Sequence, residues 1–433
     1  MRNSNTIRLL LHSVLVFVPL ILLPYSADYF YYPKILVVYV LVLLMIGVQL
    51  LSSNRRSLRL DQFSYLLLLL LVLSIVSTLF SENPIMAIWG KFRRQEGLYT
   101  VVTYALLFLF SRAYFRENNE LVNIMSITAV LVSVYGIFQY YGIDPIPRDE
   151  IRFSWVGRAF STMGNPNFLG SYLVLMLPLP LFLFLKQSKV KFLIVSSLIY
   201  WCLLLTFTRS ALLGCIVILG VATVFVFMNK KLWKPFVVLV ITFVVITVFV
   251  NQSSNGNLSG RFLSIGKDTQ LLLEKEEGYE KAGANRVYIW LRTIDLIQES
   301  PWVGYGLENL ETHFVETFQE EMIDMYGVVF LVDRAHNEYL HIAVSSGIPA
   351  LIVYLVFIWL CLKRGLELLK LNDRYLPYLT AVLAYLVQAF FNISVVSVAY
   401  IFWIFLGVIV CEGVFGEEEL KNSNPSNCVS DLN

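Results

Sequence analysis

Apolar segments long enough to cross a membrane follow one another along most of this chain. A transmembrane helix needs about 20 mostly apolar residues, and we count twelve candidates. With 57% hydrophobic and only 15% charged residues, the chain is too apolar for a soluble domain. It therefore predicts an all-α integral membrane protein with about twelve transmembrane helices. Their centres lie near Val16, Leu43, Leu70, Leu106, Val130, Leu177, Ile199, Leu219, Ile241, Tyr354, Leu386 and Leu406.

The charges in the short connections predict which side of the membrane each connection faces. Segments 186–191 and 230–234 each carry three lysines and no acid. If twelve helices alternate, these segments fall on one side, which the positive-inside rule makes cytoplasmic. Both termini are then expected in the cytoplasm of a cell whose plasma membrane holds the protein. The predicted division is a bundle of nine helices over 1–252, a large extracytoplasmic loop over 253–335, three helices over 336–412 and a short cytoplasmic tail over 413–433.

The large loop at 253–335 is expected to carry two short amphipathic helices on the membrane surface or over the bundle. The first is predicted over 284–300, with Pro301 after its end, and a turn follows over 301–306. The polar stretch 267–281 reads as a mobile loop. The apolar stripe of the first helix is Val287, Trp290, Leu291, Ile294 and Ile297, and that of the second is Leu310, Phe314 and Phe318.

Arginines gather on the predicted outer side, against the usual distribution of positive charge. An arginine at the edge of the hydrocarbon is costly, so such residues are candidates for function. Guanidinium groups also bind phosphate oxygens through paired donors. We therefore predict a pyrophosphate site, with snorkelling to lipid headgroups and salt bridges to loop acids as the alternatives. The arginines concerned are Arg93, Arg94, Arg158, Arg209, Arg286 and Arg334.

His336 stands where the polar loop meets the next apolar run, between Arg334 and Asn337. Histidine titrates near neutral pH and can take a proton from a sugar hydroxyl. The alternative is a histidine at the start of a helix, bonded to the backbone. Asn337, beside it, is a candidate substrate contact. His341 is five residues further on, which is not the i, i+4 spacing of a two-histidine metal site, so we predict no metal.

Composition excludes other partners and cofactors. A net charge of +2 gives no basic surface for nucleic acid, and no glycine-rich loop is present to hold a nucleotide. The five cysteines follow no metal or disulfide spacing and read as small packing residues. Gly164-Asn165-Pro166-Asn167 predicts a turn followed by a helix N-cap.

The chain resembles the O-antigen ligase and O-antigen polymerase superfamily of bacterial inner-membrane proteins. The resemblance covers roughly residues 30 to 410 and is most specific in the two stretches nearest the C-terminus. The stretches that carry it are Trp89-Gly90 with Arg93 to Gly97, Gly164-Asn165-Pro166-Asn167, Thr208-Arg209-Ser210, Arg286 with Trp290 and Pro301-Trp302-Val303-Gly304-Tyr305-Gly306, and Arg334-Ala335-His336-Asn337-Glu338-Tyr339-Leu340.

This resemblance implies transfer of a glycan from undecaprenyl pyrophosphate to an acceptor at the outer face of the plasma membrane. It implies an inverting glycosyltransferase that needs no metal and no cofactor. Arg209 and Arg286 would hold the pyrophosphate, and His336 would activate or orient the acceptor hydroxyl. Arg93, Arg94, Arg158, Arg334 and Asn337 would complete substrate binding. The acceptor could be a lipid A core, another glycan, a protein hydroxyl or a wall polymer, and both ligase and polymerase remain open.

Two other classes of function compete with glycosyl transfer. A transporter or flippase for a lipid-linked or anionic solute would need polar residues along a path to the inner face, whereas the basic residues crowd at the outer end. A non-catalytic scaffold for cell-envelope assembly would tolerate the loss of both Arg209 and His336.

Overall fold

The computed structural model describes residues 2–24, 28–52, 61–92, 94–117, 119–145, 155, 157–274 and 279–411, and all regular elements in these ranges are helical. The predicted tail at 413–433 and Arg93 lie outside the described residues. The helices are α1 (Arg2–Phe17), α2 (Tyr32–Leu50), α3 (Gln62–Leu79), α4 (Pro84–Trp89), α5 (Leu98–Tyr114), α6 (Asn119–Tyr140), α7 (Pro166–Met176), α8 (Pro178–Gln187), α9 (Val190–Leu205), α10 (Arg209–Met228), α11 (Trp233–Ser253), α12 (Asn257–Glu274), α13 (Arg286–Glu299), α14 (Leu310–Tyr326), α15 (Glu338–Leu369), α16 (Leu376–Ala389) and α17 (Ala399–Ile409).

The apolar segments form the helices that the sequence predicts. Each of the twelve predicted centres lies in a helix, apart from Leu177, which joins α7 to α8. Within the described ranges, seven helical spans are long and apolar enough to cross a membrane, with α7 and α8 counted as one. Helices α5, α9 and α17 are apolar but shorter. The chain is thus an all-helical integral membrane protein, while the count of twelve transmembrane helices stays a prediction.

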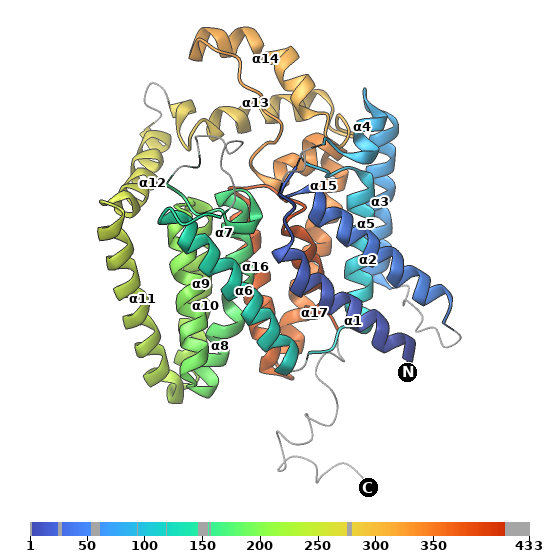
Figure 1. Ribbon diagram of the computed structural model, residues 1–433. Helices are drawn as coiled ribbons and strands as arrows, with labels where there is room; N and C mark the ends of the chain where they lie inside the picture. Colours follow the sequence, from blue (N-terminus) through green and yellow to red (C-terminus); the bar gives the residue numbers. More distant parts are fainter. Residues whose placement is uncertain are drawn as a thin grey trace.

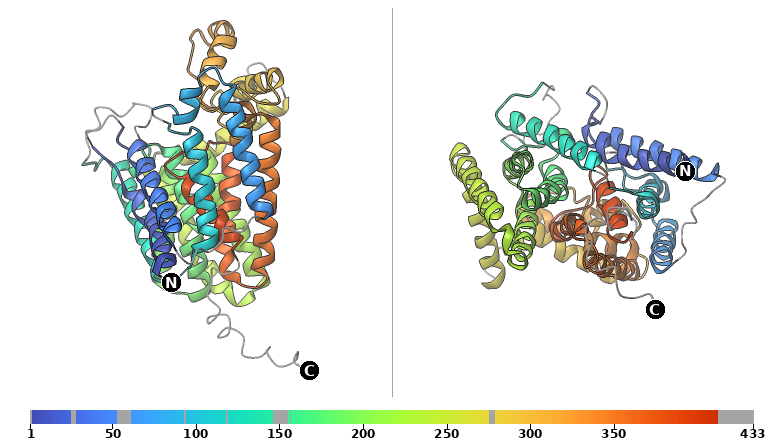
Figure 2. Two further views of the ribbon diagram at one scale, coloured as in Figure 1. Left: turned by 90° about the vertical axis from the view of Figure 1, so that its right-hand side faces the viewer. Right: turned by 90° about the horizontal axis from the view of Figure 1, so that it is seen from below.

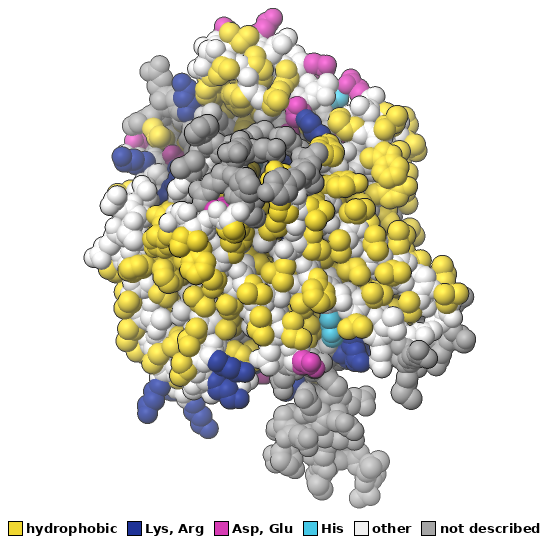
Figure 3. Space-filling view, viewed as in Figure 1, with side chains coloured by type: hydrophobic (Ala, Val, Ile, Leu, Met, Phe, Trp, Pro, Cys, Tyr) yellow, Lys and Arg dark blue, Asp and Glu magenta, His cyan; other side chains and the backbone are white. Residues whose placement is uncertain are grey.

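The helices pack into one bundle with a polar layer at one end (Figure 1). Helices α7, α16 and α17 are buried along nearly their whole length, and α5 packs against α17, α10 against α16 and α3 against α15. Figure 2 shows the same bundle from the side and from below. In Figure 3, hydrophobic side chains cover the middle of one face, and lysines and arginines gather at the end away from α13 and α14. Such a band suits contact with lipid.

Helices α13 and α14, with the connection 300–309, form a layer over one end of the bundle, which we call the cap (Figure 1). Both helices cover the residues predicted for them. The apolar stripe predicted for α13 is wrong in part, because Ile294 is exposed while Tyr288 and Leu296 are fully buried. Tyr288 packs on Tyr326 and Phe330, with ring centroids 5.4 and 6.2 Å apart. The cap therefore packs around an apolar cluster that it shares with the start of α15, which the sequence pattern did not reveal.

Helix α12 corrects the prediction of a loop with only two helices. The stretch 267–281, expected to be a mobile loop, is helical as far as Glu274. Tertiary contacts account for this: Leu258 is buried, and Asp268 pairs with Arg209 and accepts from the Gly283 amide at 3.1 Å. A polar segment can form a stable helix when such contacts hold it, which local composition does not predict.

The turn at 301–306 docks on α15 through backbone atoms. The amides of Tyr305 and Gly306 donate to the carbonyls of Val344 and Ser345, each at 2.9 Å, and the Ile348 amide donates to Pro301 at 2.8 Å. Helix α15 is interrupted at Gly347, whose φ is 83°. A Cβ there would collide with the Trp302 carbonyl. Glycine is therefore required twice over, by its backbone conformation and by the close approach.

Candidate active site

Three of the predicted arginines come together at the cap end of the bundle. Arg209 is the first residue of α10 and Arg286 the first residue of α13. Arg158 reaches the turn before α10, where its Nε donates to the Thr206 carbonyl at 2.8 Å and its Nη2 to Thr208 Oγ1 at 3.0 Å. We call Arg158, Arg209 and Arg286 the arginine cluster.

The Gly164-Asn165-Pro166-Asn167 stretch holds this cluster in place. As predicted, Asn165 caps α7, accepting from the Asn167 amide at 2.8 Å. Thr208 Oγ1 donates to the Pro166 carbonyl at 3.2 Å, and Asn167 Oδ1 accepts from Arg158 at 3.5 Å. The start of α7 and the turn before α10 therefore lie side by side. Two of the family-like motifs form one structural unit behind Arg158 and Arg209.

The arginine cluster carries an excess of positive charge. Burial and the charge of Arg209 lower the pKa of Arg286 to about 10. Burial and the charges of Arg261 and Arg286 lower the pKa of Arg158 to about 10. Among the described residues, Asp268 is the acid that pairs with Arg209, and Arg286 has no hydrogen bond or ion pair. Converging guanidinium groups that repel one another are stabilised by an anion.

His336 lies within reach of the cluster's electric field. Its backbone has a φ of 51°, a left-handed conformation that is uncommon outside glycine. Its Nδ1 is buried and finds no hydrogen-bond partner in the described ranges. Burial lowers the pKa of His336 to about 4, and the charge of Arg286 acts in the same direction, whereas Asp333 opposes it. The imidazole is therefore neutral at physiological pH and free to accept a proton.

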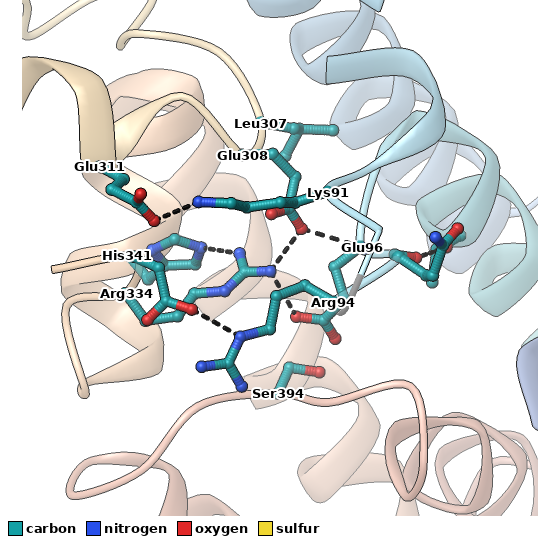
Figure 4. Close-up of polar contacts among 12 residues, drawn as sticks. Lys91, Arg94, Glu96, Leu307, Glu308, Glu311, Arg334, His341 and Ser394 are labelled. Atoms are coloured by element: carbon teal, nitrogen blue, oxygen red, sulfur yellow. Dashed lines mark hydrogen bonds and ion pairs between the residues drawn. The ribbon is translucent and has the colours of Figure 1, made fainter. Parts of the chain in front are cut away.

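Arg334 lies in a buried ionic network (Figure 4). Its side chain is only 2% exposed and pairs with Glu308 and, at 3.4 Å, with Glu96, while its Nη1 donates to His341 Nε2 at 2.6 Å. Burial alone would lower the pKa of Arg334, but the two carboxylates raise it above its ordinary value. The sequence left open whether Arg334 contacts a substrate phosphate or forms salt bridges to acids. In the structure it forms salt bridges to acids.

The neighbours of His336 also have structural contacts. Asn337 caps α15, its Oδ1 accepting from the amides of Tyr339 and Leu340 at 3.0 and 3.1 Å. Arg94 Nε donates to Asp333 Oδ2 at 2.6 Å. The segment that carries His336 is thus held on both sides of the histidine.

Sequence reasoning missed Glu96, Glu308 and His341, the partners of Arg334. Burial raises the pKa of Glu96 well above its usual range, although the Arg334 charge opposes the shift. An arginine without water must have acidic partners, so a buried Arg334 implies them. The chain has 31 acids, however, and nothing in the local pattern marks these two.

A possible cation site lies apart from this arrangement. Glu82, His313 and Glu316 bring one ligand atom each within 4.8 Å of one another, and Glu82 is largely exposed. These residues join the end of α3 to α14 and include none of the predicted catalytic residues. A cavity of about 440 Å³ at the opposite end of the bundle is lined by Lys186, Lys191 and residues near them. We assign neither feature to the candidate active site.

The fold and the site define a helical membrane protein with an arginine cluster, a neutral histidine and a buried acidic network at one end. A family model described as O-antigen ligase matches residues 192–355, a range that holds Arg209, Arg286, Arg334, His336 and Asn337. The resemblance to the O-antigen ligase superfamily is thereby confirmed. The family match and the apolar helices together indicate a bacterial membrane protein.

Two curated proteins are also similar to parts of the chain. A protein of Rickettsia conorii, described by its name as a polysaccharide ligase, is 28% identical over 145 residues, which is 33% of this chain and 34% of that protein. A general O-oligosaccharyltransferase of Acinetobacter baylyi is 24% identical over 248 residues, 54% of this chain and 40% of that protein. The chain thus matches between a third and two fifths of the length of these relatives.

Proposed function

We propose that this protein transfers a glycan from undecaprenyl pyrophosphate to an acceptor hydroxyl at the outer face of the plasma membrane, in cell-envelope polysaccharide biosynthesis. One observation supports the proposal above the others: an arginine cluster with a single described acidic partner lies near an unpartnered, neutral His336. The arginine cluster can bind a diphosphate, and the neutral His336 can accept the proton of an acceptor hydroxyl. The family match adds a class of chemistry that uses both.

The proposed reaction is a displacement at the anomeric carbon of the donor sugar. The acceptor oxygen forms the new glycosidic bond while its proton passes to the His336 imidazole. The bond between the anomeric carbon and the diphosphate oxygen breaks, and its electron pair stays on the diphosphate. Arg158, Arg209 and Arg286 bind the leaving group and stabilise this developing charge. Attack opposite the leaving group inverts the configuration, and no metal ion takes part in the steps assigned to these residues.

The residues flanking His336 take a different role from the one that the sequence suggested. The Nη atoms of Arg334 contact Glu308, Glu96 and His341, and the Asn337 side-chain oxygen caps α15. We assign both to positioning His336, because they fix the segment on either side of it. Arg94 acts with them through Asp333.

A reconstituted transfer reaction tests the proposal. Purified protein in lipid nanodiscs receives undecaprenyl-pyrophosphate oligosaccharide and a set of acceptors, and mass spectrometry identifies the product and separates ligase from polymerase activity. The expected result is a glycosylated acceptor with release of undecaprenyl pyrophosphate. A purified protein that moves the donor between leaflets but forms no product would support the transport hypothesis instead.

Two variants tie the activity to the site. His336→Ala should lower the transfer rate by about 10²–10⁴-fold, the usual loss for a general base. Arg209→Lys should also lower the transfer rate, because an ammonium cannot reproduce the forked contact of a guanidinium with phosphate. Arg364→Lys is the matched control, since Arg364 forms a partly exposed pair with Glu367 at the other end of α15. Undiminished transfer by His336→Ala would remove the histidine from the mechanism.

A further inference from the structure

A small cavity lies inside the bundle beside the Arg334 network. It has a volume of about 110 Å³ and lies between α3, α5, α15 and α17. Among its lining residues are Glu96, Arg334, Glu338, His341, Ser345 and Tyr104. We propose that this cavity binds the hydroxyl groups of the acceptor sugar, an inference that rests on the proposed transfer reaction. We call it the acceptor cavity.

The first support is a set of unsatisfied polar atoms. Glu96 Oε1, His341 Nδ1, Ser345 Oγ and Tyr104 Oη are each buried without a hydrogen-bond partner in the described structure, and all four residues line the cavity. Buried polar groups are nearly always hydrogen-bonded, so four in one small space call for a ligand or for water. The Ser345 side chain is only 2% exposed, so bulk solvent does not satisfy it.

The second support is the mixture of donors and acceptors. Arg334 donates to His341 Nε2, so the proton of the neutral ring is on Nδ1, which then offers a donor. Glu96 Oε1 offers an acceptor, and Ser345 and Tyr104 can do either. Sugar hydroxyls both donate and accept, and neighbouring hydroxyls on a ring present the two functions side by side. Tyr104 and Trp403 stack with centroids 6.1 Å apart and supply the apolar wall that a sugar ring requires.

The third support is electrostatic. Around the cavity, Glu96, Glu308 and Glu338 accompany one arginine, Arg334, whereas the arginine cluster has the opposite balance. A diphosphate is attracted to the cluster and repelled from the acidic side. A neutral polyhydroxyl group suffers no such repulsion. His336 feels the charges of both Arg286 and Arg334, so it lies close to both binding regions.

The volume limits what enters. A water molecule takes about 30 Å³ in the liquid, so the acceptor cavity holds a few waters or the hydroxyl-bearing edge of one sugar ring. The remainder of the acceptor stays outside. Displacing ordered waters by hydroxyl groups that replace their hydrogen bonds costs little.

Two variants of different kinds test the assignment. Ser345→Ala removes an unpartnered hydroxyl and should raise the KM for the acceptor about three- to tenfold, the effect of one hydrogen bond. Ser74→Leu fills the cavity from α3, where Ser74 Oγ only bonds back to Leu70 at 2.9 Å, and should raise this KM more strongly. The acceptor is the one that mass spectrometry identifies in the transfer reaction. Donor binding, measured with undecaprenyl pyrophosphate, should be unchanged in both variants.

A matched control is available on another helix. Ser126 is also buried and bonds back to Val122 at 2.7 Å, but it does not line this cavity, so Ser126→Leu should leave the acceptor KM as in the parent. An equal rise in all three variants would point to general damage and overturn the inference. An unchanged KM in both cavity variants, with active protein, would mean that the cavity holds only water. Absence of any transfer in the parent protein would instead sink the proposed function.

Discussion

At the scale of single residues, His336 combines properties that rarely occur together. It has a left-handed backbone, a buried unpartnered Nδ1 and a lowered pKa. A non-glycine residue held in such a conformation costs about 1–3 kcal/mol and persists only where the surroundings fix it. The contact of Arg94 with Asp333 and the helix cap formed by Asn337 hold the backbone of His336 in this conformation.

The lowered pKa of His336 predicts the pH dependence of transfer. Only the neutral imidazole accepts a proton, so activity is lost as the pH falls through the folded-state pKa of about 4. The acidic limb of kcat/KM should therefore lie between pH 4 and 5, well below the ordinary histidine value of about 6.5. A profile of kcat/KM from pH 4 to 8 measures it.

Arg286 provides the control for this experiment, because its charge lowers the pKa of His336. Arg286→Gln should shift the acidic limb to higher pH, whatever it does to the maximum rate. A limb near pH 6.5 in the parent protein would contradict the buried environment described for the histidine.

The sequence identified most of the charged residues at this site but not their partners. Arg158, Arg209 and Arg286 were expected because cations at the hydrocarbon edge are costly, and His336 because a histidine can take a proton near neutral pH. The structure brings them together from separate segments between positions 158 and 336. The position of Arg334 is different: its burial depends on Glu96 and Glu308, and one sequence contains no signal for contacts of that range.

At the scale of elements, backbone atoms provide part of the joint between the cap and the bundle. The turn at 301–306 donates to and accepts from α15 at three points around Gly347. These bonds do not depend on side chains, but they require that no Cβ intervene. This explains why a glycine stands where the long apolar helix is interrupted.

Gly347→Ala should therefore loosen the cap. Its Cβ would meet the Trp302 carbonyl, and its φ of 83° disfavours any side chain. We expect a destabilisation of at least about 1 kcal/mol and faster amide hydrogen exchange at 300–310. Gly220→Ala in α10 is the control, since a Cβ there has no neighbour within 4 Å and alanine favours a helix. Unchanged exchange at 300–310 in Gly347→Ala would contradict the docking.

The sequence predicted the helices correctly where a long run of apolar residues is enough to determine the structure. Runs of about 20 apolar residues formed helices, since a bilayer leaves few other ways to satisfy the backbone. Prediction failed where tertiary contacts decide. Helix α12 depends on Asp268 meeting Arg209, and the buried face of α13 depends on Tyr326 and Phe330 beyond it.

At the scale of the whole molecule, the Arg334 network ties together parts of the chain that are distant in sequence. Glu96 precedes α5, Glu308 precedes α14, and His341 is in the first turns of α15. All four side chains meet in one buried place (Figure 4). The cap, the bundle and the His336 segment therefore share one set of ionic contacts.

Arg334→Met should destabilise the whole protein. It leaves Glu308 and Glu96 buried without a counter-charge, which typically costs about 3–5 kcal/mol, and a lower thermal unfolding temperature in detergent would report it. Arg364→Met removes a partly exposed charge instead and should have little effect. Equal unfolding temperatures for the two variants would show that the network does not stabilise the fold.

The orientation of the molecule can be tested independently of activity. The lysines at 230–234 lie at the end of the bundle away from the cap (Figure 1), and the positive-inside rule predicts that this end is cytoplasmic. A cysteine replacing the exposed Glu320 of α14 should react with an impermeant thiol reagent in intact cells. One replacing Lys230 should react only after permeabilisation. The reverse pattern would place the arginine cluster on the inner face and contradict the proposed reaction.

The glycine-lined joint between cap and bundle has a consequence for how such proteins can diversify. Because main-chain groups make part of the joint, outward side chains of α13 and α14 that contact neither the joint nor the ionic network can change without loosening it. Exchanging these helices for those of a relative as one cassette, with the joint residues kept, would alter what the protein meets outside the membrane while leaving its inner machinery intact.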